Sequence, residues 1–505
     1  MLAIIYFIFF CLWIRKVAFF KDEHLSIKFI YVILIVKCLG CIAYYWVYFC
    51  YYPAGFNGDS ASTLHDAKVM YEALPNKPFD YLKMVLGLHS DADTDPLYEP
   101  YFTRIEKWGR ADITSDFFLN DNRTPIRINA LIMMFSFGSY AVHALVMIIL
   151  SFIGQFAIYK AFKKYVRNKE SLWALIIFFT PSVLFWTSGI LKEPIAIFLL
   201  GILIYVFFKI FIDHQFTSKH IFIGFFSVLS FFILKPYILI LTLIPLLALA
   251  LVHFFKPKRL ALFYLLFFVV TYGSGALILK FIFNKDVIHT IVVRQNDFIN
   301  LSKGGIFFIN GEHYVRLDHR AVNQYELVDS AKQLYRIKPH TTLMYWNVKN
   351  LNDTTFVYDN KDTSLFRLVS SCSPSGSAIS MHRLEYSIQS FTQLLPISFY
   401  NVLFKPFFYD SHSILELMAS FENLLFILFF ILCFIFKSKE KPDQSILWFC
   451  VFLVLTSFIL IGLTTTVMGA IVRYRIPFIP FLLMIPLLYL DESVYHRFRL
   501  FRKKC

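Results

Sequence analysis

The sequence predicts an all-α polytopic membrane protein of GT-C-like architecture, with about eleven transmembrane helices and two long polar segments on one membrane face. Three observations lead to this fold class. The chain of 505 residues is 58% hydrophobic and only 16% charged, whereas soluble proteins carry about 25% charged residues. Its apolar residues collect in runs of roughly 20, the length of a helix that crosses a bilayer. Its basic residues cluster between those runs.

The apolar runs give the expected membrane helices in chain order. They lie at approximately 2–20, 27–50, 130–160, 171–187, 194–212, 220–234, 237–255, 260–282, 413–436, 445–466 and 472–490. The first run lacks a basic n-region and a small-residue cleavage site, so we expect a retained helix rather than a signal peptide.

The basic clusters predict the orientation. If the spans alternate, the clusters share one side, which the positive-inside rule makes cytoplasmic. The clusters lie at 15–16, 163–169, 256–259, 437–441 and 497–504. This distribution accounts for the net charge of +15 without a nucleic-acid partner. The C-terminus is then cytoplasmic.

The chain divides into five parts on this basis. They are N-terminal membrane helices (1–50), a first outer segment with an acidic motif (51–128), central membrane helices (129–282), a second outer segment (283–412), and C-terminal membrane helices with a basic tail (413–505). In the second outer segment, Asn310-Gly311 predicts a β-hairpin turn, and residues 321–336 predict an amphipathic helix. The cytoplasmic loops are short and contain no Walker motif, which excludes ATP-driven transport by this chain alone.

The first outer segment opens with an acidic motif. After the second apolar run the chain reads Phe56-Asn57-Gly58-Asp59-Ser60, and His65-Asp66 follow. A carboxylate at the membrane exit suits a base that accepts a proton from a sugar hydroxyl attacking a membrane-borne donor. The alternative is that Asp59 and Asp66 only cap a helix.

A second set of ionisable residues ends the fourth predicted span. The segment 181–193 closes with Lys192-Glu193, directly before the next span. Ionisable groups at membrane depth cost roughly 2.5–3.5 kcal/mol on insertion scales and mark functional positions. The alternative is an ion pair that only anchors the turn.

Four further cations lie at predicted outer turns, where the positive-inside rule disfavours them. They are Lys235, Lys405, Arg473 and Arg475. Basic side chains that converge near one leaflet suit a phosphate or pyrophosphate group, with Arg as bidentate donor and Lys as point charge. Interfacial snorkelling is the alternative for any one of them. No spacing of His, Cys, Asp and Glu typical of a metal site occurs.

These motifs follow one another in a definite order along the chain. Gly58-Asp59-Ser60 and the 181–193 turn come first, then Lys235-Pro236-Tyr237, Lys405-Pro406-Phe407 leading to 420–423, and Arg473-Tyr474-Arg475 before Pro477. This order resembles bacterial multispanning membrane proteins of cell-surface polysaccharide clusters, namely GT-C-type glycosyltransferases and O-antigen or capsule repeat-unit polymerases. The resemblance runs from about residue 55 to about residue 485.

The resemblance implies a polyprenyl-phosphate or polyprenyl-diphosphate sugar donor, used at the outer face of a bacterial inner membrane. In GT-C enzymes, an Asp of the first outer loop acts as base or helps to hold a metal, which implies Asp59, with Asp66 in reserve. Since Gly58-Asp59-Ser60 lacks a neighbouring second acid, a divalent metal is not predicted as a requirement. Both outer segments are long, so polymerase and monomer transferase stay open.

The resemblance also implies the contacts to donor and partners. In the polymerases, outer-face Arg residues contact phosphate and sugar, which implies Arg473 and Arg475, with Lys192 and Lys235 as helpers. From the sequence itself we expect Glu193 to orient its neighbour Lys192. The expected partners are a polyprenyl-linked saccharide, membrane lipid and other polysaccharide assembly proteins. Two other classes remain alternatives: a flippase for the same lipid-linked saccharides, and a non-catalytic assembly subunit.

Overall fold

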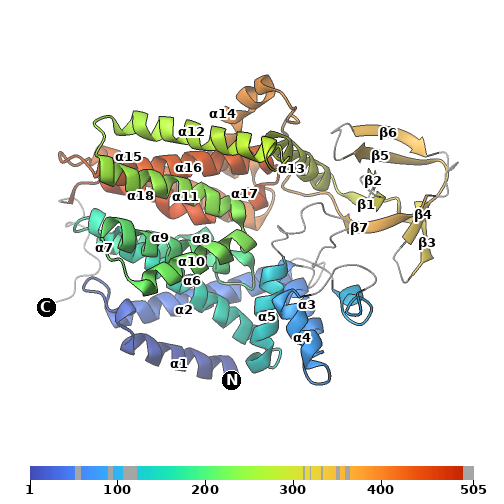
Figure 1. The fold of residues 1–505 in the computed structure, drawn as a ribbon, viewed down its shortest axis with the longest axis horizontal. Helices are drawn as coiled ribbons and strands as arrows, with labels where there is room; N and C mark the ends of the chain where they lie inside the picture. The colour runs from blue at the N-terminus through green and yellow to red at the C-terminus, as the bar shows by residue number, and fades with distance from the viewer. Residues whose placement is uncertain are drawn as a thin grey trace.

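The computed structural model describes residues 1–51, 58–88, 95–105, 122–310, 313–318, 320–330, 334–347, 353–358 and 364–492. These residues form a helix bundle with an antiparallel β-sheet at one end (Figure 1). Within them, eight helices are long and apolar enough to cross a membrane. They are 27–51, 140–165, 192–212, 236–255, 260–281, 414–435, 444–464 and 468–489. The chain is therefore a multi-pass membrane protein by helix length and composition.

The helices of the bundle pack side by side in Figure 1. Those before residue 187 are α1 Leu2–Lys16, α2 Ile27–Trp46, α3 Asp59–Tyr71, α4 Pro78–Leu86, α5 Arg123–Ser136, α6 Tyr140–Phe162, α7 Glu170–Phe179 and α8 Pro181–Trp186. Those after it are α9 Lys192–Phe207, α10 Ser218–Leu234, α11 Pro236–Phe255, α12 Leu260–Phe281, α13 Val287–Ser302, α14 Ile388–Phe404, α15 Ile414–Ile435, α16 Gln444–Thr464, α17 Met468–Tyr474 and α18 Ile479–Tyr489.

Three of the eleven predicted spans form helices shorter than a full crossing. The helix α1 has 15 residues and α10 has 17. The predicted span 171–187 breaks between α7 and α8, where Thr180 takes a non-helical ψ of 120°. The residue before a proline is disfavoured in the helical region, so Pro181 sets this break. The predicted span 130–160 also divides, because Phe137 and Gly138 have positive φ angles of 51° and 76°.

Close packing of α6 on α9 fixes the centre of the bundle. Gly154 and Gly201 face each other so closely that a Cβ on either would overlap the backbone of the other helix. Small residues at helix contacts are typical of membrane bundles, where they let two backbones approach. This contact positions α9, which begins at Lys192 and Glu193.

The second predicted outer segment contains a seven-stranded antiparallel sheet, which corrects the all-α fold class. Its order is β3-β4-β7-β1-β2-β5-β6. The strands are β1 Gly305–Asn310, β2 His313–Leu317, β3 Tyr325–Asp329, β4 Leu334–Ile337, β5 Thr341–Asn347, β6 Asp353–Tyr358 and β7 Phe366–Cys372. The predicted hairpin is confirmed, since Asn310 pairs with His313; its turn, 311–312, lies outside the described residues.

The helix predicted for residues 321–336 is wrong. A 3-10 turn covers Val322–Gln324, and β3 and β4 follow. The reason is tertiary pairing: β4 joins β7, with Leu334 opposite Arg367. An aromatic cluster stabilises the pairing, because the Tyr325 ring centroid lies 5.6 Å from that of Tyr335 and 5.2 Å from that of Phe308.

The two ends of the bundle differ in charge. We call the end next to the sheet and α3 the sheet end, and the opposite end the basic end. At the basic end, Lys160 donates to the Phe19 carbonyl oxygen (2.8 Å) and Arg167 pairs with Glu440 (3.0 Å). The Arg167–Glu440 pair joins the predicted basic clusters 163–169 and 437–441, and the Lys160–Phe19 bond joins segments next to the clusters 163–169 and 15–16. The predicted tail cluster, 497–504, lies outside the described residues.

Candidate functional site

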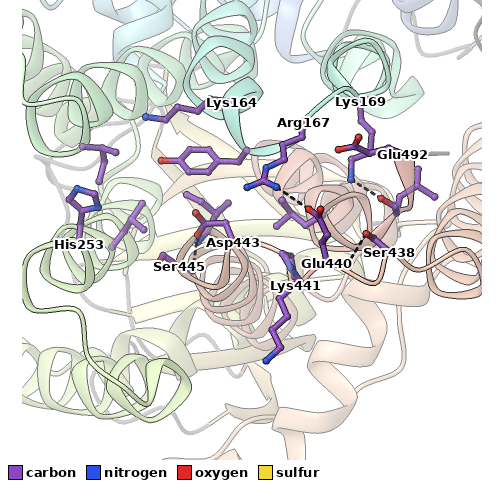
Figure 2. A pocket seen from close by; sticks show the side chains of 17 residues that line it. Lys164, Arg167, Lys169, His253, Ser438, Glu440, Lys441, Asp443, Ser445 and Glu492 are labelled. Atoms are coloured by element: carbon purple, nitrogen blue, oxygen red, sulfur yellow. Dashed lines mark hydrogen bonds and ion pairs between the residues drawn. The ribbon is translucent and has the colours of Figure 1, made fainter. Parts of the chain in front are cut away.

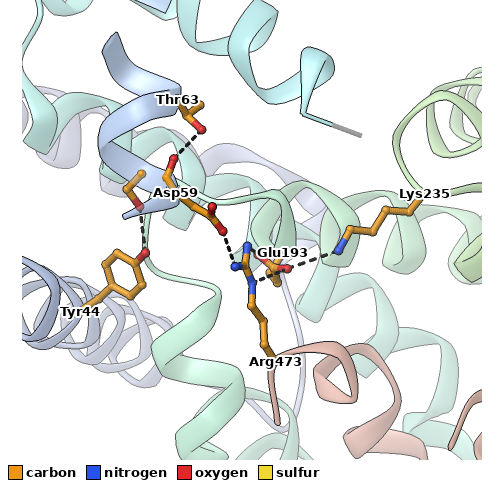
Figure 3. Close-up of polar contacts among 7 residues, drawn as sticks. Tyr44, Asp59, Thr63, Glu193, Lys235 and Arg473 are labelled. Carbon is orange, nitrogen blue, oxygen red and sulfur yellow. Dashed lines mark hydrogen bonds and ion pairs between the residues drawn. The ribbon is translucent and has the colours of Figure 1, made fainter. Parts of the chain in front are cut away.

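Four of the predicted site residues meet at the sheet end of the bundle. Asp59, Glu193, Lys235 and Arg473 form one connected set of ion pairs, shown in Figure 3. They come from α3, α9, the turn before α11, and α17. Asp59 and Arg473 are 414 residues apart in the sequence. The fold, rather than sequence proximity, therefore creates this charge cluster.

Asp59 owes its position to the start of α3. The helix begins at Asp59 after the extended Gly58, and a carboxylate in a first turn interacts favourably with the helix dipole. The Thr63 hydroxyl donates to the Asp59 carbonyl oxygen (2.7 Å). One residue further on, the Ser60 hydroxyl lies 3.0 Å from the Tyr44 hydroxyl of α2. These bonds hold the start of α3 against the membrane helices (Figure 3).

Arg473 is the centre of the cluster. Its Nη1 donates to Asp59 Oδ2, and its Nη2 donates to Glu193 Oε2 (2.9 Å). Its Nε lies 2.9 Å from the second oxygen of Glu193. The guanidinium carbon also lies 5.4 Å from the centre of the Trp186 ring. A planar guanidinium that bridges two carboxylates over an indole is a geometry that lysine cannot reproduce.

Lys235 completes the cluster from the opposite side. It ends the turn between α10 and α11, and its Nζ lies 3.3 Å from Glu193 Oε1. The same Nζ lies 5.7 Å from the Tyr474 ring centre. Glu193 therefore pairs with both cations, Lys235 and Arg473. Glu193 belongs to the first turn of α9, where the helix dipole favours a negative charge.

The two carboxylates of the cluster differ in their exposure to solvent. The Asp59 side chain is 43% exposed and that of Arg473 is 17% exposed, whereas Glu193 and Lys235 are 2% and 4% exposed. Removing one partner of a buried ion pair leaves an uncompensated charge and is strongly destabilising. An exposed partner can be replaced by another anion at much lower cost. Asp59 is therefore the replaceable partner of Arg473, and Glu193 is the fixed one.

Arg475 does not join the cluster, although Arg473 precedes it by two residues. It is buried, and its guanidinium donates to the carbonyl oxygens of Val402 (2.9 Å) and Lys405 (3.3 Å) and to Asn423 Oδ1 (2.6 Å). Glu422 Oε2 lies 4.0 Å away. The described contacts make Arg475 a structural link between α14 and α15. Lys405 takes part in that link through its backbone carbonyl.

The other two predicted residues lie on α3 and α9, the helices that carry Asp59 and Glu193. Asp66, on α3, is fully buried, with one carboxylate oxygen 3.4 Å from His65 Nδ1. Its burial means that it does not share the solvent access of Asp59. Lys192 is the first residue of α9 and is half-buried.

Sequence reasoning missed the aromatic residues of the site. Trp186 and Tyr474 face the two cations, and Tyr44 supports the start of α3. Aromatic residues at span ends are normally assigned to the interfacial belt. The available signal was their sequence context, because Trp186 lies within the 181–193 motif and Tyr474 lies between the two arginines.

The arrangement offers a replaceable carboxylate, a guanidinium and a lysine around one point. Among the described residues, no group of three or more His, Cys, Asp or Glu side chains could hold a metal ion. Compared with protein-family models, curated proteins and solved structures, the chain matches none of them.

Proposed function

We propose that this chain is an integral-membrane glycosyltransferase or polysaccharide polymerase that uses a polyprenyl-phosphate or polyprenyl-diphosphate sugar at the outer face of a bacterial inner membrane. One observation carries the proposal: the ion pair between Asp59 and Arg473 at an end of a membrane bundle. A carboxylate that would act as the base lies beside a guanidinium that would bind the donor phosphate, and this supports the proposal.

The charge balance of the cluster suggests how a donor would bind. Two carboxylates and two cations give a formally neutral cluster in the absence of ligand. A donor phosphate would take the place of Asp59 on Arg473, since phosphate also accepts two parallel N–H bonds from a guanidinium. Lys235 would add a second positive charge. Glu193, which is buried, would keep both cations in position.

The same exchange would prepare the chemistry. Once it leaves Arg473, the Asp59 carboxylate loses its counter-ion and becomes a better proton acceptor. The acceptor hydroxyl would transfer its proton to Asp59 while its oxygen forms a bond to the anomeric carbon of the donor sugar. The bond between that carbon and the phosphate oxygen would break. Arg473 and Lys235 would stabilise the negative charge of the departing polyprenyl phosphate or polyprenyl diphosphate.

Lys37 and His143, which lie inside predicted spans, favour this proposal over transport. A translocation path is lined by ionisable groups that face a water-filled cavity. Lys37 is fully buried and donates to Gln155 Oε1 (2.8 Å) and Thr187 Oγ1 (2.9 Å). His143 is also fully buried, between Ser136 and Asn129, with both distances 2.8 Å. Both side chains form hydrogen bonds that link neighbouring helices.

The proposal is tested in cells that carry Asp59→Ala or Arg473→Ala in place of the chromosomal copy, at matched membrane abundance. Glu72→Ala and Arg104→Ala are matched controls, because they break an exposed ion pair of 2.8 Å in the same polar segment. Surface polysaccharide is resolved by gel, and lipid-linked intermediates are measured by mass spectrometry. The site variants should lose long chains, while the controls keep them.

The intermediates decide between the two activities. Accumulation of single complete lipid-linked repeat units identifies a polymerase. Accumulation of truncated units identifies a monomer transferase. Normal polysaccharide in both site variants would overturn the catalytic proposal and favour a flippase or an assembly subunit.

A further inference from the structure

A cavity of about 520 Å³ lies at the basic end of the bundle, far from the Asp59 cluster (Figure 2). Its walls come from the turn after α6, the end of α11, the turn before α16 and the end of α18. Helices end here, so the cavity lies at the level where lipid head groups meet a membrane protein.

Four basic side chains line this cavity: Lys164, Arg167, Lys169 and Lys441. Lys169 is buried and donates only to backbone oxygens in the described contacts, those of Leu487 (3.0 Å) and Leu490 (2.8 Å). Figure 2 shows Lys169 and Arg167 on neighbouring parts of the wall. Lys164, Arg167 and Lys169 come from the turn between α6 and α7, and Lys441 comes from the turn before α16.

The carboxylates of the cavity already have partners, and Lys164 is also paired, with Asp213 (2.6 Å). Glu440 pairs with Arg167 (3.0 Å), and Glu492 accepts from the Asn168 side chain (2.9 Å). Asp443 caps α16 by accepting from the backbone N–H groups of Ser445 (2.9 Å) and Ile446 (3.1 Å). Asp443 therefore caps the N-terminus of α16, where its negative charge compensates the helix dipole rather than the charge of the lysines.

Apolar side chains complete the walls. They are Ile212, Leu249, Ile446, Leu488 and Leu490. A second hollow of about 470 Å³ has the same character, with Lys258 and Arg259 beside Leu260, Leu262 and Trp448. The start of α16 separates the two, because Gln444 lines the second and Ser445 lines the first. Basic and apolar groups side by side match an amphiphile better than a fully water-soluble ligand.

We propose that the cavity of about 520 Å³ binds an anionic phosphate head group, supplied by a phospholipid of the surrounding leaflet. Arg167 and Lys441 are the cations that can turn toward the phosphate, since both are exposed at the rim. Lys169 supplies positive charge from the wall, whereas Asp213 balances the charge of Lys164, and the apolar residues receive the start of the acyl chains. The site is independent of glycosyl transfer.

The test compares two double variants of the full-length protein purified in detergent. One carries Arg167→Gln and Lys441→Gln, and leaves the Lys164–Asp213 pair and the buried Lys169 intact. The control carries Lys16→Gln and Lys439→Gln, which remove the same charge from exposed positions at the same end. Binding of phosphatidylglycerol and of phosphatidylcholine with identical acyl chains is measured by native mass spectrometry.

The cavity variant should bind phosphatidylglycerol roughly 30-fold more weakly, since each lysine or arginine near an anionic lipid contributes about 1 kcal/mol. The control should bind like the unaltered protein. Equal affinity in both double variants, or equal affinity for the two lipids, would overturn the proposal. Millimolar inorganic phosphate is the second probe: if it displaces the lipid, the source is a soluble phosphate compound, and if it does not, the source is the lipid.

Discussion

Arg473 and Arg475 lie two residues apart, yet their guanidinium groups serve different networks: the first contacts Asp59 and Glu193, and the second contacts Asn423 and backbone carbonyls. Two residues correspond to about 200° around a helix, so neighbours at this spacing point to opposite sides. One arginine is partly open to solvent and the other is buried. A ligand can therefore compete for Arg473 but not for Arg475.

The first prediction separates these roles by substitution. Arg475→Gln leaves the buried Glu422 without its nearby cation, which should destabilise the fold by on the order of 3 kcal/mol. Arg473→Gln should keep near-normal membrane abundance, because Glu193 retains Lys235. Thermal unfolding in detergent and polysaccharide output measure the two effects. If Arg475→Gln folds normally and loses only activity, the structural assignment of Arg475 is wrong.

The second prediction concerns Asp59 as proton acceptor. Asp59→Asn keeps the size of the side chain and a hydrogen-bond acceptor for Arg473, but it removes the basic carboxylate. Transfer by the purified protein should fall by roughly 10²–10⁴-fold, the usual contribution of a general base. Binding of the donor should be unchanged or tighter, because the competing negative charge is gone. Glu72→Gln, with its exposed carboxylate in the same segment, should leave the rate unchanged.

The third prediction is a pH dependence of stability from α13. Burial raises the pKa of Asp297 to about 6, although the nearby Arg294 acts in the opposite direction. The folded state therefore binds this proton more tightly than the unfolded state, and the contribution of Asp297 to stability falls as the pH rises from about 4 to about 6. Asp297→Asn should raise the unfolding temperature at pH 7.5.

The same substitution provides its own control at low pH. At pH 4, Asp297 is protonated in the folded protein, so Asn and Asp should then give similar unfolding temperatures. Equal effects of Asp297→Asn at pH 4 and pH 7.5 would show that the carboxyl does not titrate between them.

The membrane helices could be predicted because the bilayer imposes a local rule. A crossing helix needs about 20 apolar residues, and that signal is contained in the run itself. The hairpin of β1 and β2 also had a local signal, the Asn310-Gly311 turn. The strand β4 pairs with its sequence neighbour β3 and with β7, which lies about 30 residues further along the chain. These pairings in the sheet override the local helix periodicity.

The candidate site, too, could be predicted from the sequence only in part. Asp59, Glu193, Lys235 and Arg473 could each be selected because ionisable residues at membrane depth are rare. Which of them meet depends on the rotation and depth of each helix, and the sequence does not state these. The phosphate site was predicted from cations alone. In the fold, the cations Arg473 and Lys235 come with Glu193 between them, while Arg475 is used elsewhere.

The last prediction tests whether Glu193 is the fixed counter-ion of the cluster. Glu193→Gln removes a buried charge that faces two cations, so it should destabilise the fold by on the order of 3 kcal/mol. Lys235→Met should cost less, because Glu193 keeps Arg473. In the double variant Arg473 still pairs with Asp59, so the combined loss should be smaller than the sum of the two single losses. Additive losses in thermal unfolding would mean that Glu193 and Lys235 act independently, and that Glu193 does not hold Lys235 in place for a phosphate ligand.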